Sequence, residues 1–200
     1  MCNDYAREIE ADKWIQYMRE MEHVPPFEWA NDQTPNNIGP KQHIKITESG
    51  LTVGLKGGKL IGSMMKWAWK ERGRPIFNYI SEKRDFSHND RYLILATGFY
   101  EYTASKNPKA KLKEQHLFSL KGEEWFWVAG IVKHNAFTML TTAPGPDIEP
   151  YHDRQICIIP PKLGIDWLLY DHPERLLKAP PTGTLGVKTL QRWGSSGPLS

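Results

Sequence analysis

From about residue 42 onward the chain consists of short apolar runs separated by turn signals, and this pattern restricts the fold more than any other feature. Residues 43–47 and 51–55 alternate between apolar and polar side chains around a turn at 48–50, which predicts a β-hairpin. Strands and helices do not alternate along the chain, so the pattern indicates an α+β protein built on antiparallel sheet. Further strands are predicted over residues 59–67, 92–102, 116–120, 124–132, 137–142, 155–159 and 184–190.

Helical periodicity is confined to the two ends of the chain. Residues 5–22 predict an amphipathic helix with Trp14 and Met18 on one face, and residues 162–170 and 173–178 predict two short helices. The polar stretch from Asn31 to Lys41 is interpreted as a surface loop able to line a site. We expect one domain over residues 1–193 and a loose tail over 194–200.

Composition excludes several classes of protein. No apolar run approaches the roughly 20 residues that span a bilayer, and the first residues lack the pattern of a signal peptide, so we expect a cytosolic protein without membrane contact. The chain has only two cysteines, Cys2 and Cys157, which argues against a disulfide framework and a structural zinc site. We expect no metal and no cofactor, and interpret Cys157, inside an apolar run, as a core thiol.

The formal net charge of +3 combines an acidic first segment with a basic body. Residues 1–32 carry a net charge of −5, which leaves +8 on residues 33–200. Basic residues among aromatic ones favour single-stranded nucleic acid, because phosphates need cations and unstacked bases need a flat partner; the alternative is a solvated lysine-rich loop beside core tryptophans. Two basic clusters stand out, the first interleaved with Trp67 and Trp69: Lys66, Lys70, Arg72 and Arg74, and then Lys106, Lys109, Lys111 and Lys113.

Cys2 draws attention because of its position after Met1. Removal of Met1 would leave a free α-amine and a thiol on adjacent carbons. Such amines have a pKa of ~7.7–8.0 and thiols of about 8.5, so a useful fraction of each is nucleophilic near neutral pH. The pair could act as an N-terminal nucleophile on an amide, or condense with an aldehyde to an imine that the thiol closes to a thiazolidine. The third interpretation is an incidental cysteine.

Three further side chains suit proton transfer or anion binding. Strand alternation over residues 98–102 would place Glu101 with Phe99 on one face; an aromatic environment favours the protonated carboxyl and prepares it for acid–base work, whereas the alternative is a surface glutamate at a strand end. His152 and Arg154 precede a buried strand, where the imidazole can shuttle protons and the guanidinium can hold a phosphate. The other histidines, His43 among them, are interpreted as surface or structural residues.

These residues belong to a longer series of motifs that resembles the SOS response-associated peptidase (SRAP) family, whose members crosslink to abasic sites in single-stranded DNA. Each motif is weak alone, but their order and spacing across residues 1–160 make chance resemblance unlikely. The matching segments are Met1-Cys2, Asn37-Ile38-Gly39-Pro40, Trp67-Ala68, Asn78 with Ser81-Glu82, Gly98-Phe99-Tyr100-Glu101-Tyr102, Ala129-Gly130-Ile131, residues 137–142 and His152-Asp153-Arg154.

The resemblance implies a single domain of antiparallel sheets with a barrel-like core and flanking helices. It implies a monomer that binds single-stranded DNA, associates with the nucleoid when bound, and uses Cys2 to attack the ring-opened sugar of an abasic site after Met1 is removed. Asn78 would orient Cys2 or the adduct, while Glu101 and His152 would move protons. Together with the basic cluster, the resemblance leads us to expect DNA binding by Arg154, Asn37, Pro40, Lys66, Trp67, Trp69, Arg72 and Arg74.

The sequence departs from the family pattern at three places. Asp4 stands where the family has an arginine, Ile80 replaces the arginine of the family's N-A-R segment, and Gln155-Ile156 replaces the usual Met-Pro pair. Two cationic phosphate contacts are therefore missing, and we expect weaker, less salt-sensitive DNA binding. Two alternatives remain open: an N-terminal-nucleophile amidase or peptidase, and a divergent protein that binds single-stranded DNA reversibly.

Overall fold

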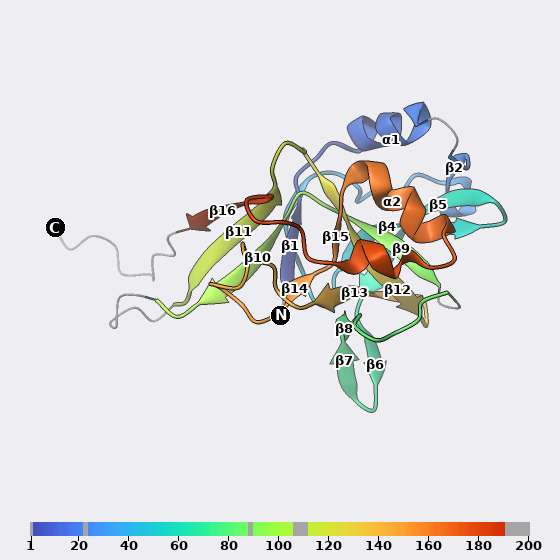
Figure 1. Cartoon of the computed structure of the whole chain (residues 1–200). Coiled ribbons are helices and arrows are strands. Elements are labelled where there is room, and N and C mark those ends of the chain that lie inside the picture. Colours follow the sequence, from blue (N-terminus) through green and yellow to red (C-terminus); the bar gives the residue numbers. More distant parts are fainter. Residues whose placement is uncertain (1, 22–23, 88–89, 106–111, 191–200) are drawn as a thin grey trace.

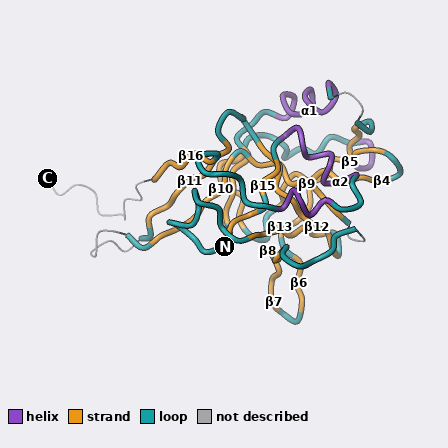
Figure 2. The backbone as a smooth tube through the Cα atoms, viewed as in Figure 1, coloured by secondary structure: helices purple, strands orange, loops and turns teal. Residues whose placement is uncertain are grey.

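A computed structural model describes residues 2–21, 24–87, 90–105 and 112–190 of the chain. Strands form most of the regular secondary structure, and helices and loops surround them (Figures 1 and 2). The α+β class is confirmed. The predicted tail over residues 194–200 and the lysines at 106, 109 and 111 lie outside the described residues. Within those ranges no helix is long and apolar enough to cross a membrane.

The first sheet has five antiparallel strands in the order β16-β11-β10-β1-β3. It therefore joins segments from both ends of the chain, with β1 held between β3 and β10. Its strands are β1 (Asp4–Arg7), β3 (Lys41–Lys45), β10 (Gly98–Thr103), β11 (Glu114–Leu120) and β16 (Leu185–Leu190).

The second sheet closes on itself. Its nine strands follow the path β14-β13-β12-β9-β4-β5-β2, with β15 and β8 attached at the side. Because β13 pairs with both β12 and β5, strands β5, β4, β9, β12 and β13 form a ring, which confirms the barrel-like core. The strands are β2 (Phe27–Trp29), β4 (Ser49–Lys56), β5 (Lys59–Trp67), β8 (Asn78–Ile80), β9 (Arg91–Ala96), β12 (Phe126–Lys133), β13 (Ala136–Thr142), β14 (Gln155–Ile156) and β15 (Ile158–Ile159).

A small hairpin, β6 (Trp69–Glu71) and β7 (Arg74–Ile76), forms a separate two-stranded sheet. Both turn residues have positive φ, 48° at Arg72 and 77° at Gly73, as a two-residue I′ turn requires. The hairpin projects from the body of the protein directly before β8 (Figure 1).

The helices are shorter than predicted. α1 covers Ala11–Glu20 and α2 covers Gly164–Leu169, with 3₁₀ turns at Ala30–Asp32, Pro161–Leu163 and Pro173–Leu177. The predicted start of the first helix at residue 5 is wrong, because residues 4–7 form β1 and their pairing with two neighbouring strands outweighs local helical periodicity.

Two strand predictions are also wrong, one in its pairing and the other in its extent. Residues 43–47 and 51–55 do not form a hairpin: β3 pairs with β1, and β4 pairs with β5 through a turn at Gly57-Gly58. The single strand predicted over 92–102 is split at Thr97 into β9 and β10, which belong to different sheets. The chain thus passes from the barrel into the five-stranded sheet just before Glu101.

Alternate residues of the barrel strands face two different hydrophobic cores. In β9, Leu93 and Leu95 pack in a core with Trp14 of α1, whereas Ile94 and Ala96 pack in the core between the sheets. Burial on both faces explains why these strands are continuous apolar runs. Cys157 is fully buried in the first core, which confirms it as a core thiol.

Candidate active site around Cys2

Cys2 lies at the start of β1 and is buried, with 1% of its surface exposed. Its Sγ donates a hydrogen bond to the main-chain oxygen of Asp4 at 3.3 Å. Burial raises the pKa of the Cys2 thiol far above its usual range, and the nearby negative charge of Glu101 raises it further. The thiol is therefore protonated at neutral pH and needs a proton acceptor before or while it reacts.

Asn78 holds the main chain of Cys2. It opens β8, which runs parallel to β13, and its Nδ2 donates to the main-chain oxygen of Cys2 at 2.7 Å. The Oδ1 atom of Asn78 is buried and has no hydrogen-bond partner within the described residues. Asn78 thus combines one anchored donor with one buried acceptor beside Cys2.

Glu101 is buried on β10, with 2% of its surface exposed. Its cross-strand neighbour is His116, and Phe99, two residues earlier on the same face, packs in the core between the sheets. Burial raises the pKa of Glu101 to about 7. The predicted desolvation of this carboxyl is therefore present in the structure, and the group exists in both protonation forms near neutral pH.

His152 approaches Glu101 from a loop, with Nε2 3.9 Å from Oε2 of the carboxyl. Its Nδ1 lies 3.0 Å from the main-chain nitrogen of Arg154 and 2.8 Å from Oδ1 of Asp153. A neutral ring can accept the Arg154 N–H at Nδ1, whereas a protonated ring can donate to Asp153 instead. Burial lowers the pKa of His152, which favours the neutral ring.

Arg154 does not point its guanidinium at an open surface, contrary to the expected role in phosphate binding. Nη1 and Nη2 form a bidentate ion pair with Glu82 at 2.6 and 2.8 Å, and Nη2 also donates to the main-chain oxygen of Thr141 at 2.8 Å. The ion pair lowers the pKa of Glu82 to about 2. Arg154 therefore ties the His152 loop to the segment that follows β8, because both of its Nη atoms are engaged in these contacts.

The residues predicted to bind DNA divide into two groups. Lys66, Arg72 and Arg74 are exposed, as are Asn37 and Pro40 on the loop before β3. The prediction that Trp67 and Trp69 stack on bases is wrong, because a base needs an exposed ring and these rings are 0% and 5% exposed. The Nε1–H of Trp67 donates a hydrogen bond to the main-chain oxygen of Phe77, and the ring packs against Tyr5 and Phe137 in the core.

Two contributors near the site were not found from the sequence. Arg7 is buried in β1, and its Nη2 donates to the main-chain oxygens of Asn37 and Gly39 at 2.9 and 2.8 Å, which fixes the loop before β3. Asp4 is also buried and contacts His43 and Tyr102. The pairing of β1 with β3 creates both arrangements, and no local pattern signals that pairing.

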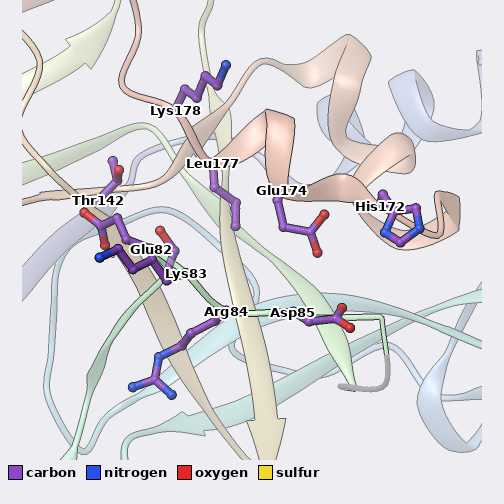
Figure 3. Close-up of a pocket in the computed structure, with 10 residues that line it drawn as sticks. Glu82, Lys83, Arg84, Asp85, Thr142, His172, Glu174, Leu177 and Lys178 are labelled. Carbon is purple, nitrogen blue, oxygen red and sulfur yellow. The ribbon is translucent and has the colours of Figure 1, made fainter.

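A hollow of about 600 Å³ lies between residues 81–85 and the segment 172–178 (Figure 3). Cys2, Asn78, Glu101 and His152 do not line it. Most of its charged groups are engaged within the protein: Glu82 binds Arg154, Glu174 accepts from the Phe86 nitrogen, and Arg84 donates to Tyr79. The hollow is therefore a weaker candidate for a catalytic or binding site than the surroundings of Cys2. Within the described ranges, no group of three or more His, Cys, Asp and Glu residues could hold a metal ion.

Comparison with known proteins identifies the family of the chain. Residues 1–190 match the family model described as SOS response associated peptidase (SRAP). The chain belongs to the SRAP family. It is 30% identical over 185 residues to the abasic site processing protein YoqW of Bacillus subtilis (strain 168), an alignment that covers 84% of this chain and 80% of the relative. The YoqW protein of Bacillus phage SPbeta matches to the same extent.

Solved structures share the fold of this SRAP protein. A phage-related protein from Bordetella bronchiseptica superposes with a TM-score of 0.68 at 16% identity, covering 96% of this chain and 95% of that one. A protein from Bacteroides thetaiotaomicron gives a TM-score of 0.69 at 14% identity, covering 95% and 92%. At these identities the likeness concerns the fold alone.

Proposed function

We propose that this SRAP protein, acting as a monomer, processes abasic sites in single-stranded DNA by forming a covalent thiazolidine through Cys2 after removal of Met1. The observation that carries the proposal is a group of three side chains from separate segments. Asn78 holds the carbonyl oxygen of Cys2, and the buried Glu101, with its raised pKa, acts on the Cys2 thiol through its charge. His152 lies 3.9 Å from the Glu101 carboxyl. The name of the YoqW relatives supports the substrate class.

The protonated thiol favours an order of steps in which the amine reacts first. The free α-amine of Cys2 adds to the aldehyde of the ring-opened sugar, and the resulting carbinolamine loses one water to give an imine. The thiol then adds across the C=N bond: a C–S bond forms, and the thiol proton passes to the nitrogen. Because burial keeps the sulfur protonated, it enters only at this closing step.

Glu101 and His152 supply the proton transfers. A carboxyl with a pKa of about 7 retains a protonated fraction at neutral pH and can donate to the departing hydroxyl of the carbinolamine. His152, whose pKa is lowered by burial, is available as a base during opening of the sugar ring. The two groups thus provide an acid and a base within one site at the same pH.

DNA contact falls to the exposed cations rather than to Arg154. Lys66 at the end of β5 and Arg72 and Arg74 on the β6–β7 hairpin are exposed, and β7 continues through Phe77 into Asn78. A strand of DNA whose sugar reaches Cys2 would therefore pass close to the base of this hairpin. Exposed cations beside the reactive group suit the phosphate backbone.

Incubation with a single-stranded oligonucleotide that contains one abasic site tests the proposal. We expect a covalent band on a denaturing gel, an intact mass that lacks Met1, and loss of the band in Cys2→Ala. Cys157→Ala, which removes the other thiol, serves as the matched control and should retain the band. Retention of Met1 on the purified protein, a band that survives Cys2→Ala, or no band from processed wild-type protein would contradict the proposal.

A further inference from the structure

Asp4 is buried in a hydrogen-bonded network that crosses four strands of the five-stranded sheet. With 2% of its surface exposed, its Oδ2 contacts Nδ1 of His43 on β3 at 2.9 Å and accepts from the hydroxyl of Tyr102 on β10 at 3.2 Å. Gln115 on β11 in turn donates to Tyr102 at 3.0 Å. The carboxylate therefore joins the first strand to the strands on both of its sides.

This network occupies the face of the sheet opposite to Glu101. Tyr5, next to Asp4 in β1, packs in the core between the sheets, so alternation directs Asp4 away from that core. Tyr102 likewise follows Glu101 and points to the other face, and the ring of His43 stacks on Tyr100 at 4.7 Å. The carboxylate of Asp4 thus cannot touch a sugar held between Cys2 and Glu101.

The main chain of Asp4 nevertheless contacts the reactive residue. Its carbonyl oxygen accepts the hydrogen bond from the Cys2 thiol, and only Asn3 separates the two residues. Any displacement of Asp4 along or out of the sheet therefore moves the acceptor that orients Sγ. On the other side of Cys2, Asn78 holds its carbonyl oxygen.

The charges around Asp4 suit a carboxylate that is held inside the protein. His43 and Lys45 face it from β3, Tyr100 and Tyr102 from β10, and the Cys2 thiol from its own segment. Burial raises the pKa of Asp4, while the hydrogen bond from His43 opposes that rise. A phosphate in the same place would meet a buried negative charge.

We propose that Asp4 is a positioning residue, whose carboxylate, held by His43 and Tyr102, fixes the start of β1 so that the Cys2 thiol keeps its place beside Glu101. The inference rests on the proposed reaction of Cys2. It assigns a different task to the position where the family has an arginine: Asp4 acts on the rate of the covalent step through Cys2 and leaves DNA affinity unchanged.

Substitutions at Asp4 separate rate from affinity. The rate constant is measured as single-turnover crosslinking at saturating abasic oligonucleotide, and affinity by fluorescence anisotropy of the same substitutions combined with Cys2→Ala. We expect Asp4→Asn to lower the rate constant about tenfold, since small misplacements of reacting groups have large effects, with the dissociation constant within about twofold. Asp4→Arg should lower the rate at least as much while DNA affinity stays equal or increases.

Two further variants keep the test decisive. Glu28→Gln, an acid-to-amide change at an exposed ion pair with Lys59, is the matched control and should change neither value. Tyr102→Phe removes one partner of the carboxylate and should give a smaller rate loss of the same kind if Asp4→Asn does not fold. A slower rate for Asp4→Asn with an unchanged dissociation constant supports the proposal; a changed dissociation constant with an unchanged rate overturns it, as does an unchanged rate in both variants.

Adduct formation with acetaldehyde, followed by intact mass, separates this inference from the DNA reaction. If wild-type protein forms the acetaldehyde adduct but no DNA crosslink, the proposed function fails, and the rate ratio of wild type to Asp4→Asn on acetaldehyde still tests the positioning role. An equal slowing on both aldehydes supports that role. A slowing on DNA alone contradicts it, because a residue that positions Cys2 acts on every aldehyde.

Discussion

The Cys2 site and the β6–β7 hairpin are linked through Asn78, which follows the hairpin in the chain, but they differ in almost every physical respect. Cys2 and Glu101 are 1% and 2% exposed and are held by contacts from several strands. The hairpin strands, by contrast, pair only with each other within the described residues, and Arg72 and Arg74 are exposed. Under the proposed function, chemistry that needs shifted pKa values takes place where water is excluded, and contact with a flexible polyanion takes place where cations stay solvated.

The difference predicts that reaction rate and DNA affinity can be changed separately. Substitutions in the buried site should alter the rate at saturating DNA, and substitutions on the hairpin should alter only affinity. A single result in which both regions change the same quantity would break the comparison.

Glu101→Gln should have the largest effect, a loss of about 10²–10⁴-fold in the single-turnover rate at unchanged affinity, because it removes a proton donor. Glu149→Gln, an exposed acid-to-amide change, is the control. A rate loss below about threefold would contradict the assignment of Glu101 as the acid.

The pH dependence of that loss sharpens the prediction. The carboxyl acts when protonated, and its pKa is about 7, so the ratio of wild-type to Glu101→Gln rates should be constant below about pH 6. Above about pH 8 it should fall about tenfold per pH unit as the donor ionises. A ratio that rises with pH would instead indicate a base.

Trp67→Ala should have the next largest effect. It should lower the free energy of unfolding by about 3–5 kcal/mol, since the ring is fully buried between Tyr5 and Phe137. Urea unfolding measures it. Leu55→Ala, a partly exposed apolar residue at the β4–β5 turn, should cost far less. A normal unfolding midpoint with weakened DNA binding would restore the base-stacking interpretation.

Arg72→Gln combined with Arg74→Gln should weaken DNA binding about tenfold and reduce the slope of log affinity against log salt by about 1.4, the value for two phosphates on a single strand. The rate at saturating DNA should not change. Lys13→Gln with Lys162→Gln, two exposed cations by the helices, serves as the charge-matched control. An unchanged slope would show that the hairpin does not contact phosphate.

Ile80→Arg should have the smallest effect. It should increase DNA affinity about threefold and steepen the slope of log affinity against log salt by about 0.7. Ile80 is 51% exposed on the same strand as Asn78, so a cation there can reach a phosphate without disturbing the core. Ile80→Leu should change neither quantity. Tighter binding by Ile80→Leu would indicate an apolar contact instead.

Sequence periodicity predicts where strands and helices lie better than it predicts which strands pair with each other. The strand over 59–67 is confirmed residue for residue as β5, because its apolar positions face a core whatever its neighbours are. The pairing of β1 with β3 and β10 joins residues far apart in the chain, and nothing local to 4–7 signals it. For the same reason the helix predicted from residue 5 begins only at Ala11.

The site is predictable where a residue's chemistry is visible from its neighbours. The desolvation of Glu101 follows from its alternation with Phe99 in a short aromatic strand. The ion pair of Arg154 with Glu82 and the contact of Asp4 with His43 depend on which strands lie side by side. The sequence therefore suggested a DNA contact for Arg154 and, at Asp4, only the loss of one. Charge and aromatic patterns alone do not distinguish a buried tryptophan from a base-stacking one, as Trp67 illustrates.

The place of β16 in the sheet has a consequence for synthesis of the protein. β1, which begins two residues after Cys2, and β16, which ends at Leu190, belong to one sheet, separated by β10 and β11. On a ribosome, the first strand emerges long before β10, the His152 loop and β16 are available to complete its surroundings. The nascent chain therefore carries its cysteine without the side chains that surround it in the folded protein, and the proposed reactive centre forms only after the segment around His152 has been made.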